Sequence, residues 1–431
     1  MRVHYRTFGC KANQYDTERM RQELEARGAR TADERDEADV YVVNTCTVTN
    51  HADAEARRLV RRLHRERPGA RIVVAGCSAA LRAESYAAMP GVAAVVPGHD
   101  PVAVADGAAP PLAQLGLGAS LARLDHEPVG GELLRGRRGG SRGWLKVQDG
   151  CDRKCSFCAT RLARGPSRSR PVDEVVAEAR LLAETHAELV ITGIHIGHYG
   201  RDLDPPSSLS RLCAALLERV PGVRFRVGSV EATEVDDLLL DLLATSGGAL
   251  APHLHMPLQS GADPVLRRMR RWHTRGQYRA RALEIASRVE PLGLGADVIT
   301  GFPGETDADH ARTRALVEEL PFTYLHVFPF SPRDGTAAAS LEGRVPQRVA
   351  GERARELRAL AAEKARGHRR SRLGGAATVV LEGASGTALT GDYLRVRAPA
   401  QLRGRRGLLE GTLAGDEAHL RIDVPLRFSP N

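Results

Sequence analysis

The chain has 431 residues, which at roughly 100 to 200 residues per domain leaves room for two to four domains, and we expect three. No stretch approaches the roughly 18 consecutive apolar residues that a membrane span needs, and the first residues carry no apolar signal core, so we expect a cytoplasmic protein without membrane contact. The net charge of +9 is compatible with a polyanionic partner such as nucleic acid, although only 4 of the 62 basic residues are lysines, which also fits a general bias toward arginine. Seven cysteines in a reducing compartment favour metal binding or catalysis over a disulfide framework.

The first segment alternates strand-like runs with helical periodicity, which predicts an α/β domain with a parallel sheet. The expected strands are residues 3–8, 40–45 and 71–76, and the expected helices are 13–27, 50–65 and 79–89. Cys10, Cys46 and Cys77 each follow one of these strands within two residues. Because the carboxyl ends of parallel strands line a common crevice, the three thiols can converge on one metal site. Any one of them alone would more often be a small buried hydrophobic residue.

The remaining chain divides into a linker, a central domain and a small C-terminal domain. Residues 107–142 are rich in small residues, proline and arginine and only weakly periodic; we place the first domain at 1–125 and a linker at 126–142. In 143–372, six strand-like runs with helical stretches between them predict an open, partial (β/α)6 barrel with its chemistry at the C-terminal face. These runs are 144–148, 189–192, 225–231, 253–259, 296–301 and 324–330. Short strands between glycines in 373–431 predict a small β-barrel of the oligonucleotide-binding kind.

A second set of cysteines, Cys151, Cys155 and Cys158, lies in the loop after the first central strand. Thiols at positions i, i+4 and i+7 of a short loop can surround one cubane cluster, and three thiolates leave one of its four irons open to a ligand. Structural zinc usually takes four protein ligands. Under that alternative, His186 or His195 could supply the fourth ligand.

The Cys-x3-Cys-x2-Cys spacing, with the aromatic Phe157 inside it, resembles the signature of radical S-adenosylmethionine enzymes. The resemblance implies that this trio holds a [4Fe-4S] cluster whose open iron binds S-adenosylmethionine, the source of a 5'-deoxyadenosyl radical. It also implies cofactor contacts at Thr192 and Gly193 after the second strand, and at Glu231 and Gln259 at strand ends. The alternatives at these positions are a tight turn for the glycine and satisfied polar caps for the others.

Motifs along nearly the whole chain are similar to those of the methylthiotransferase family. They are Gly-Cys-Lys-x-Asn at 9–13, Asn-Thr-Cys-Thr-Val-Thr-Asn at 44–50, Ala-Gly-Cys at 75–77, His-Met-Pro-Leu-Gln-Ser-Gly at 255–261, Gly-Phe-Pro-Gly-Glu-Thr at 301–306 and Gly-Asp-Tyr-Leu-Arg-Val at 391–396. The last resembles the RNA-binding TRAM module. By this resemblance Cys10, Cys46 and Cys77 hold a second [4Fe-4S] cluster that carries the sulfur for transfer. Cys213 is then left over, and we interpret it as a core residue.

Lys11 and residues 47–50 resemble the branch of this family that acts on threonylcarbamoyladenosine in tRNA. The resemblance implies a methylthio group added at C2 of that nucleoside at position 37, the anticodon stem-loop as partner, and an electron donor of flavodoxin or ferredoxin type, with the sulfur donor unknown. A base in a single-stranded loop can be splayed into a barrel mouth. Alternative hypotheses are an enzyme for isopentenyladenosine in tRNA or for an aspartate of a ribosomal protein, and a non-catalytic, metal-dependent RNA-binding protein.

The helical stretch before the C-terminal domain is strongly basic, with nine basic and three acidic residues between 345 and 373. It is either a solvated helix face or a surface that contacts phosphates. Under the second interpretation, neutralising Arg366, Arg369, Arg370 and Arg372 lowers both the affinity for tRNA and its salt dependence.

Overall fold

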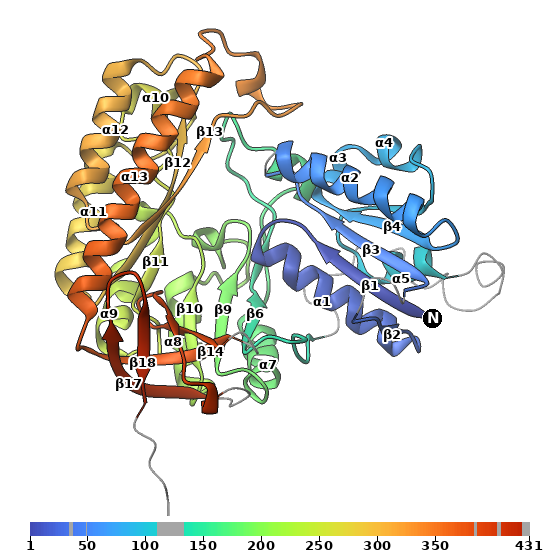
Figure 1. The fold of residues 1–431 in the computed structure, drawn as a ribbon, viewed down its shortest axis with the longest axis horizontal. Helices are drawn as coiled ribbons and strands as arrows, with labels where there is room; N and C mark the ends of the chain where they lie inside the picture. The colour runs from blue at the N-terminus through green and yellow to red at the C-terminus, as the bar shows by residue number, and fades with distance from the viewer. Residues whose placement is uncertain (34–37, 49, 110–132, 383–385, 403–406, 425–431) are drawn as a thin grey trace, which may run out of the picture.

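The computed structural model describes residues 1–33, 38–48, 50–109, 133–382, 386–402 and 407–424 (Figure 1). The first part of the predicted linker 126–142, residues 126–132, lies outside these residues. Its last part packs against the central domain, where Leu134 is 1% exposed and its N–H donates to Glu178. Within the described ranges, every helix is too short or too polar to cross a membrane.

The N-terminal domain is a five-stranded parallel sheet with the strand order β2-β1-β3-β4-β5. Its strands are β1 (Arg2–Thr7), β2 (Arg30–Thr31), β3 (Val40–Thr45), β4 (Arg71–Gly76) and β5 (Val92–Pro97). Its helices are α1 (Lys11–Ala26), α2 (Asn50–Glu66), α3 (Cys77–Leu81), α4 (Ala83–Ala87) and α5 (Pro101–Ala108). Two separate apolar clusters, one on each face of the sheet, explain why β3 is buried along its whole length. The predicted α/β domain is confirmed, with β2 and β5 added at the sheet edges.

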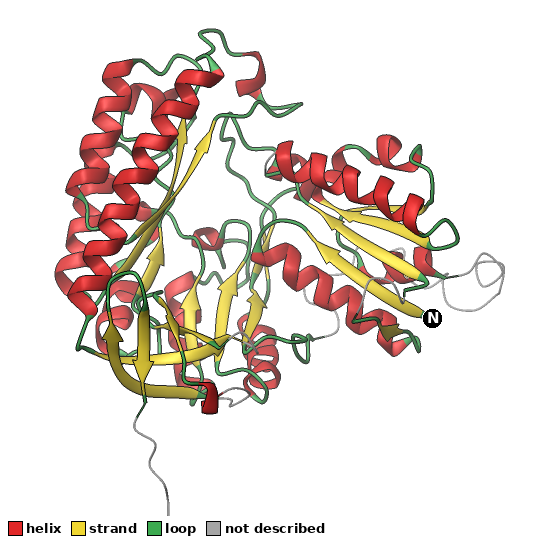
Figure 2. Ribbon diagram, viewed as in Figure 1, coloured by secondary structure: helices red, strands yellow, loops and turns green. Residues whose placement is uncertain are grey.

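The central domain is a curved sheet of six parallel strands with helices on its outer side (Figure 2). The strands are β6 (Arg142–Lys146), β9 (Glu188–Thr192), β10 (Arg224–Val227), β11 (His253–His255), β12 (Gly293–Thr300) and β13 (Tyr324–Pro329). They form two three-stranded sheets, which a single bridge between Ser229 and His255 joins. The two outermost strands, β6 and β13, do not pair with each other, so the barrel is open. The predicted open (β/α)6 barrel is thus confirmed for the residues that the structure describes.

The outer helices are α7 (Val172–Ala183), α8 (Leu209–Arg219), α9 (Asp237–Thr245), α11 (Arg275–Arg288), α12 (Asp307–Glu319) and α13 (Gln347–Arg372). Shorter elements lie in the loops: β7 (Gln148–Asp149), β8 (Arg168–Ser169), α6 (Thr160–Arg164) and α10 (Asp263–Arg268). The N-terminal domain packs beside β6, where Tyr15 of α1 joins the central core and donates to Glu178 (Figure 1). Cys213 on α8 is 1% exposed in the same core, as expected.

The C-terminal domain is a closed five-stranded barrel with the order β14-β15-β16-β18-β17, which confirms the predicted small β-barrel. Its strands are β14 (Ala376–Glu382), β15 (Thr387–Thr390), β16 (Arg395–Arg397), β17 (Leu408–Gly415) and β18 (Leu420–Asp423). The sequence predicts strands at 377–381, 393–397, 407–414 and 420–424, so β15 was not predicted.

Two buried arginines of β10, Arg224 and Arg226, join this barrel to the base of the central domain. Their guanidinium groups donate to four carbonyls of the C-terminal barrel, those of Thr378, Leu389, Thr390 and Gly391. Glu188 is fully buried between them, and its Oε2 lies 2.6 Å from Arg224 Nε and 2.9 Å from Arg226 Nη2. Burial alone would raise the pKa of Glu188, but Arg226 and Arg224 lower it to about 2.

Candidate metal centres at the domain interface

Cys10, Cys46 and Cys77 lie at the carboxyl ends of three neighbouring strands, β1, β3 and β4. Cys10 precedes α1, Cys46 directly follows β3, and Cys77 begins α3. A Cβ at Gly9, whose φ is +98°, would lie 2.6 Å from the Sγ of Cys46, so this position requires glycine. The pKa of Cys77 is raised to about 12, mainly by burial; Arg164 opposes this rise, and the nearby thiols of Cys10 and Cys46 add to it. The predicted convergence of these three thiols on one site is therefore what the fold produces.

Asn13 ties the strand ends of this site together. Its Nδ2 donates to the carbonyls of Phe8 and Thr45 at 2.8 and 2.9 Å, which links the ends of β1 and β3. The thiols of Cys46 and Cys77 are buried, whereas Cys10 is exposed. The site thus has a closed side formed by the sheet and an open side toward the central domain.

The loop with Cys151, Cys155 and Cys158 is held against the end of β9 by the buried side chain of Gln148. The Nε2 of Gln148 donates to the next two backbone carbonyls and to Ser167 Oγ, and its Oε1 accepts the N–H groups of Ile194 and His195. A Cβ at Gly193 would lie 2.7 Å from the carbonyl oxygen of Gln148. Thr192 and Gly193 are thus packed directly against the start of the cysteine loop.

The thiols of this loop also affect one another. The pKa of Cys151 is raised to about 11, mainly by burial; a backbone hydrogen bond from Arg153 opposes the rise, and Cys158 and Cys155 add to it. The Sγ of Cys151 lies 3.7 Å from His195 Nδ1, and Arg271 donates to the Sγ of Cys155 at 3.6 Å. Arg271 lowers the pKa of Cys155 against the larger effect of burial and so favours its thiolate, which is the form that binds metal.

The other predicted cofactor residues surround the same loop. Phe157 packs edge-to-face on Phe302, at 6.4 Å between ring centroids, and so anchors the loop. Glu231 is paired with Arg271, the arginine that reaches Cys155. Gln259, with a φ of +68°, donates its N–H to the carbonyl of Asp297 at 2.8 Å. Contacts of these residues with a cofactor remain predictions, and Arg271 carried no sequence signal that singled it out.

Arg164 connects the two cysteine sets through a buried ionic network. Its guanidinium, which is 0% exposed, donates to Cys77 Sγ at 3.3 Å and to both carboxylate oxygens of Asp149 at 2.8 and 3.0 Å. It also donates to Asp16 at 2.8 Å and to Asn13 at 2.5 Å, in the N-terminal domain. Lys146 pairs with the same two aspartates at 2.6 Å. Arg164 lies six residues after Cys158, so the two trios flank one interface.

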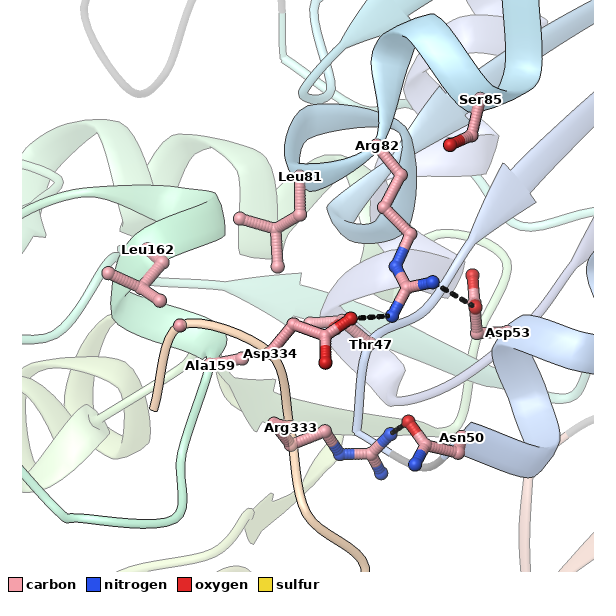
Figure 3. A pocket seen from close by; sticks show the side chains of 11 residues that line it. Thr47, Asn50, Asp53, Leu81, Arg82, Ser85, Ala159, Leu162, Arg333 and Asp334 are labelled. Carbon is pink, nitrogen blue, oxygen red and sulfur yellow. Dashed lines mark hydrogen bonds and ion pairs between the residues drawn. The ribbon is translucent and has the colours of Figure 1, made fainter. Parts of the chain in front are cut away.

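A cavity of about 400 Å³ opens at this interface (Figure 3). It is lined by Thr47, the residue after Cys46, and by Ala159, the residue after Cys158. Arg82, on the upper side in this view, forms ion pairs with two aspartates: its Nη1 lies 3.7 Å from Asp53 Oδ2, and its Nη2 lies 2.7 Å from Asp334 Oδ2.

Arg333 fastens the other wall of the cavity by donating to Asn50 and to the carbonyl of Val48. The residues around Cys46 are thereby bound to the loop that follows β13. The volume lies within the range of small-molecule sites.

The number of thiols favours an iron–sulfur cluster at each site, and one imidazole nitrogen also lies near each trio: His99 Nε2 is 3.6 Å from Cys77 Sγ, and His195 Nδ1 is 3.7 Å from Cys151 Sγ. Each site offers three free thiols and no fourth thiol nearby among the described residues. His186 is remote from the loop, because its Nε2 accepts the N–H of Arg137 before β6. The nitrogen that faces the loop is His195 Nδ1, while its Nε2 contacts Glu234 at 3.0 Å.

Comparison with known proteins agrees with this geometry. Residues 2–98 match the family described as uncharacterized protein family UPF0004, and residues 145–317 match the radical SAM superfamily. The chain is 37% identical to threonylcarbamoyladenosine tRNA methylthiotransferase MtaB of Bacillus subtilis, over 84% of this chain and 81% of the relative. It is 38% identical to a tRNA-2-methylthio-N(6)-dimethylallyladenosine synthase of Sorangium cellulosum, over 81% and 76%.

Among solved structures, the radical S-adenosylmethionine methyltransferase TsrM of Kitasatospora setae, with cobalamin and a [4Fe-4S] cluster bound, has a similar fold. The TM-score is 0.55 at 16% identity, over 78% of this chain and 77% of that one. At this identity the similarity establishes the fold alone.

Proposed function

Because the chain belongs to the family of radical S-adenosylmethionine tRNA methylthiotransferases, we propose that it adds a methylthio group to C2 of threonylcarbamoyladenosine at position 37 of tRNA. As members of this family do, it uses S-adenosylmethionine and iron–sulfur clusters. The observation that carries the proposal is the meeting of two cysteine trios at one interface, joined by Arg164.

In this proposal Cys151, Cys155 and Cys158 hold the cluster that binds S-adenosylmethionine, and Cys10, Cys46 and Cys77 hold the second. When bound, the first cluster and S-adenosylmethionine supply a 5'-deoxyadenosyl radical, which removes hydrogen from an unactivated carbon.

The protein's own residues orient and enclose these groups. Gln148 fixes the cysteine loop against Thr192 and Gly193, which we propose as cofactor contacts together with Phe157, Glu231 and Gln259. The guanidinium of Arg271 favours the thiolate of Cys155.

The identity of the modified base rests on residues near the first trio, since relatives acting on two different nucleosides are about equally similar to the chain. Lys11 and residues 47–50 favour threonylcarbamoyladenosine, and Thr47 and Asn50 line the cavity between the trios. We further propose a cytoplasmic location, an electron donor of flavodoxin or ferredoxin type, and a TRAM-like role in RNA binding for the C-terminal barrel.

The experiment that tests the proposed function is nucleoside mass spectrometry of tRNA from a strain that lacks the gene. The methylthiolated threonylcarbamoyl nucleoside should disappear and return when the gene is restored. Loss of the methylthiolated isopentenyl nucleoside instead would identify the other tRNA branch. Iron and sulfide analysis after anaerobic reconstitution should give about eight irons per chain, whereas zinc alone would reject the radical chemistry.

A further inference from the structure

The floor of the central barrel is built from residues of two domains. Gly293, Gly295 and Asp297 alternate along β12 and therefore share the face that lines the lumen. A Cβ at Gly293 would lie 2.3 Å from the carbonyl oxygen of Asp392, and a Cβ at Gly295 would lie 2.0 Å from the ring of Tyr324. The two glycines thus make room for a turn of the C-terminal barrel and for a tyrosine ring.

Aromatic and imidazole rings complete this floor. Tyr393, from the turn of the C-terminal barrel, stacks on His253 with ring centroids 4.2 Å apart. The hydroxyl of Tyr324 lies 2.9 Å from His253 Nε2 and 3.1 Å from His255 Nδ1. The lower lumen is therefore closed and polar.

Above the floor, Asp297 joins two histidines of the neighbouring strands. Its carboxylate oxygens lie 3.1 Å from His255 Nε2 and 3.2 Å from His326 Nδ1. Burial alone would raise the pKa of Asp297, but these two contacts lower it. The side-chain exposure rises from 9% at His255 to 28% at Asp297 and 56% at His326, so a ligand can reach the polar atoms of this wall from the His326 side.

Lys11 approaches the lumen from the N-terminal domain. Its ammonium group lies near enough to Arg142 on β6, Glu188 on β9 and Arg226 on β10, as well as to the adjacent Cys10, for their charges to act on it. Its own charge reaches His253 on β11. A side chain close to these four strands lies within the curve of the sheet.

The Lys11 ammonium has no ion pair or hydrogen bond with any residue in the described part of the chain. Glu188, whose charge also reaches it, already pairs with three arginines. A half-buried ammonium group that bonds no residue in the described part of the chain is available to pair with an anionic ligand.

We propose that the barrel lumen binds the substituent on N6 of the target adenosine, with Lys11 pairing its carboxylate and the His255–Asp297–His326 wall bonding its hydroxyl and carbonyl groups. This inference rests on the proposed function, and it explains the choice of nucleoside chemically. The threonylcarbamoyl group carries a carboxylate, a hydroxyl and a urea. An isopentenyl group carries none of these and would leave Lys11 and Asp297 desolvated without partners.

The test is a binding measurement with the reconstituted holoenzyme and no reductant, so that affinity is read independently of turnover. The probes are anticodon stem-loops that contain threonylcarbamoyladenosine, its methyl ester, or isopentenyladenosine. The wild-type protein should bind the acid about 10- to 100-fold more tightly than the neutral ester, as expected for one charged hydrogen bond. Lys11→Met should abolish this preference, and Lys11→Arg should keep part of it.

The matched control is Arg219→Met, which removes an exposed cation paired with Asp173 on the outer layer of the barrel. It should leave the preference unchanged, and the iron content of every variant is measured because Lys11 adjoins Cys10. Equal wild-type affinity for acid and ester overturns the inference, even if Lys11→Met loses iron. So does a full-iron Lys11→Met protein that discriminates like the wild type. Failure of the reduced wild-type enzyme to methylthiolate any threonylcarbamoyl stem-loop instead rejects the proposed function.

Discussion

Replacing Arg164 with methionine should loosen the contact between the N-terminal and central domains. The substitution removes both hydrogen bonds to Asp149 and those to Asp16, Asn13 and Cys77, all of them buried. Removing one partner from a buried ionic network costs about 3 to 5 kcal/mol, because the remaining charges stay desolvated. Lys146 still neutralises part of the two aspartates, so we expect about 3 kcal/mol.

A cost of about 3 kcal/mol corresponds to a roughly 100-fold larger population of the undocked state. Native-state proteolysis reports this population when opening is fast relative to cleavage. Arg164→Met should therefore be cleaved between the domains roughly 100-fold faster, and adding Asp149→Asn should recover part of the loss. The control is Arg161→Met, an exposed arginine on the same helix. Equal cleavage rates for the Arg164 and Arg161 variants would refute the role assigned to the network.

Three further predictions concern RNA binding, pH and metal content. Arg355 and Arg366 are exposed, and because they are 11 residues apart they share one face of α13. Changing both to glutamine should weaken tRNA binding and flatten its salt dependence by up to about 0.9 per phosphate contact. An unchanged slope would reject this face as the RNA surface. Glu188 has a folded pKa of about 2 against its ordinary 4.5, so its stabilisation of about 3 kcal/mol is present above pH 4.5 and is lost as the pH falls toward 2. Glu188→Gln should be less stable at neutral pH and should lose less stability on acidification. Parallel curves of stability against pH for the two proteins would contradict this. Cys46→Ala should lose about half of the iron but keep reductive cleavage of S-adenosylmethionine, and loss of all iron would argue against two separate sites.

Local periodicity predicted the elements that carry the cysteines, because buried parallel strands read as apolar runs and the thiols follow them directly. It failed where chain geometry interrupts the pattern. The expected strand 253–259 ends at His255, two residues before Pro257. The six-residue edge strand β5, which contains two alanines and ends at Pro97, was not predicted.

Contacts between distant residues were beyond sequence reasoning. Arg164 meets Asp16 from 148 positions away, and nothing in the local sequence distinguishes it from the exposed Arg161. Likewise, three of the four arginines expected to contact phosphates are already engaged. Arg369 and Arg370 bond Glu417, and Arg372 bonds Asp392. Only Arg366 has no partner among the described residues, so the fourfold substitution would also disturb the docking of the C-terminal barrel.

The most direct test of the central claim is a single reaction. The reconstituted enzyme, S-adenosylmethionine, a low-potential reductant and an anticodon stem-loop with threonylcarbamoyladenosine are combined anaerobically, and the nucleosides are analysed by mass spectrometry. The wild-type protein should form the 2-methylthio derivative, and a protein in which either Cys46 or Cys155 is replaced by alanine should form no such product. Methylthiolation of an isopentenyladenosine stem-loop in its place, or product formation without Cys46, would contradict the central claim.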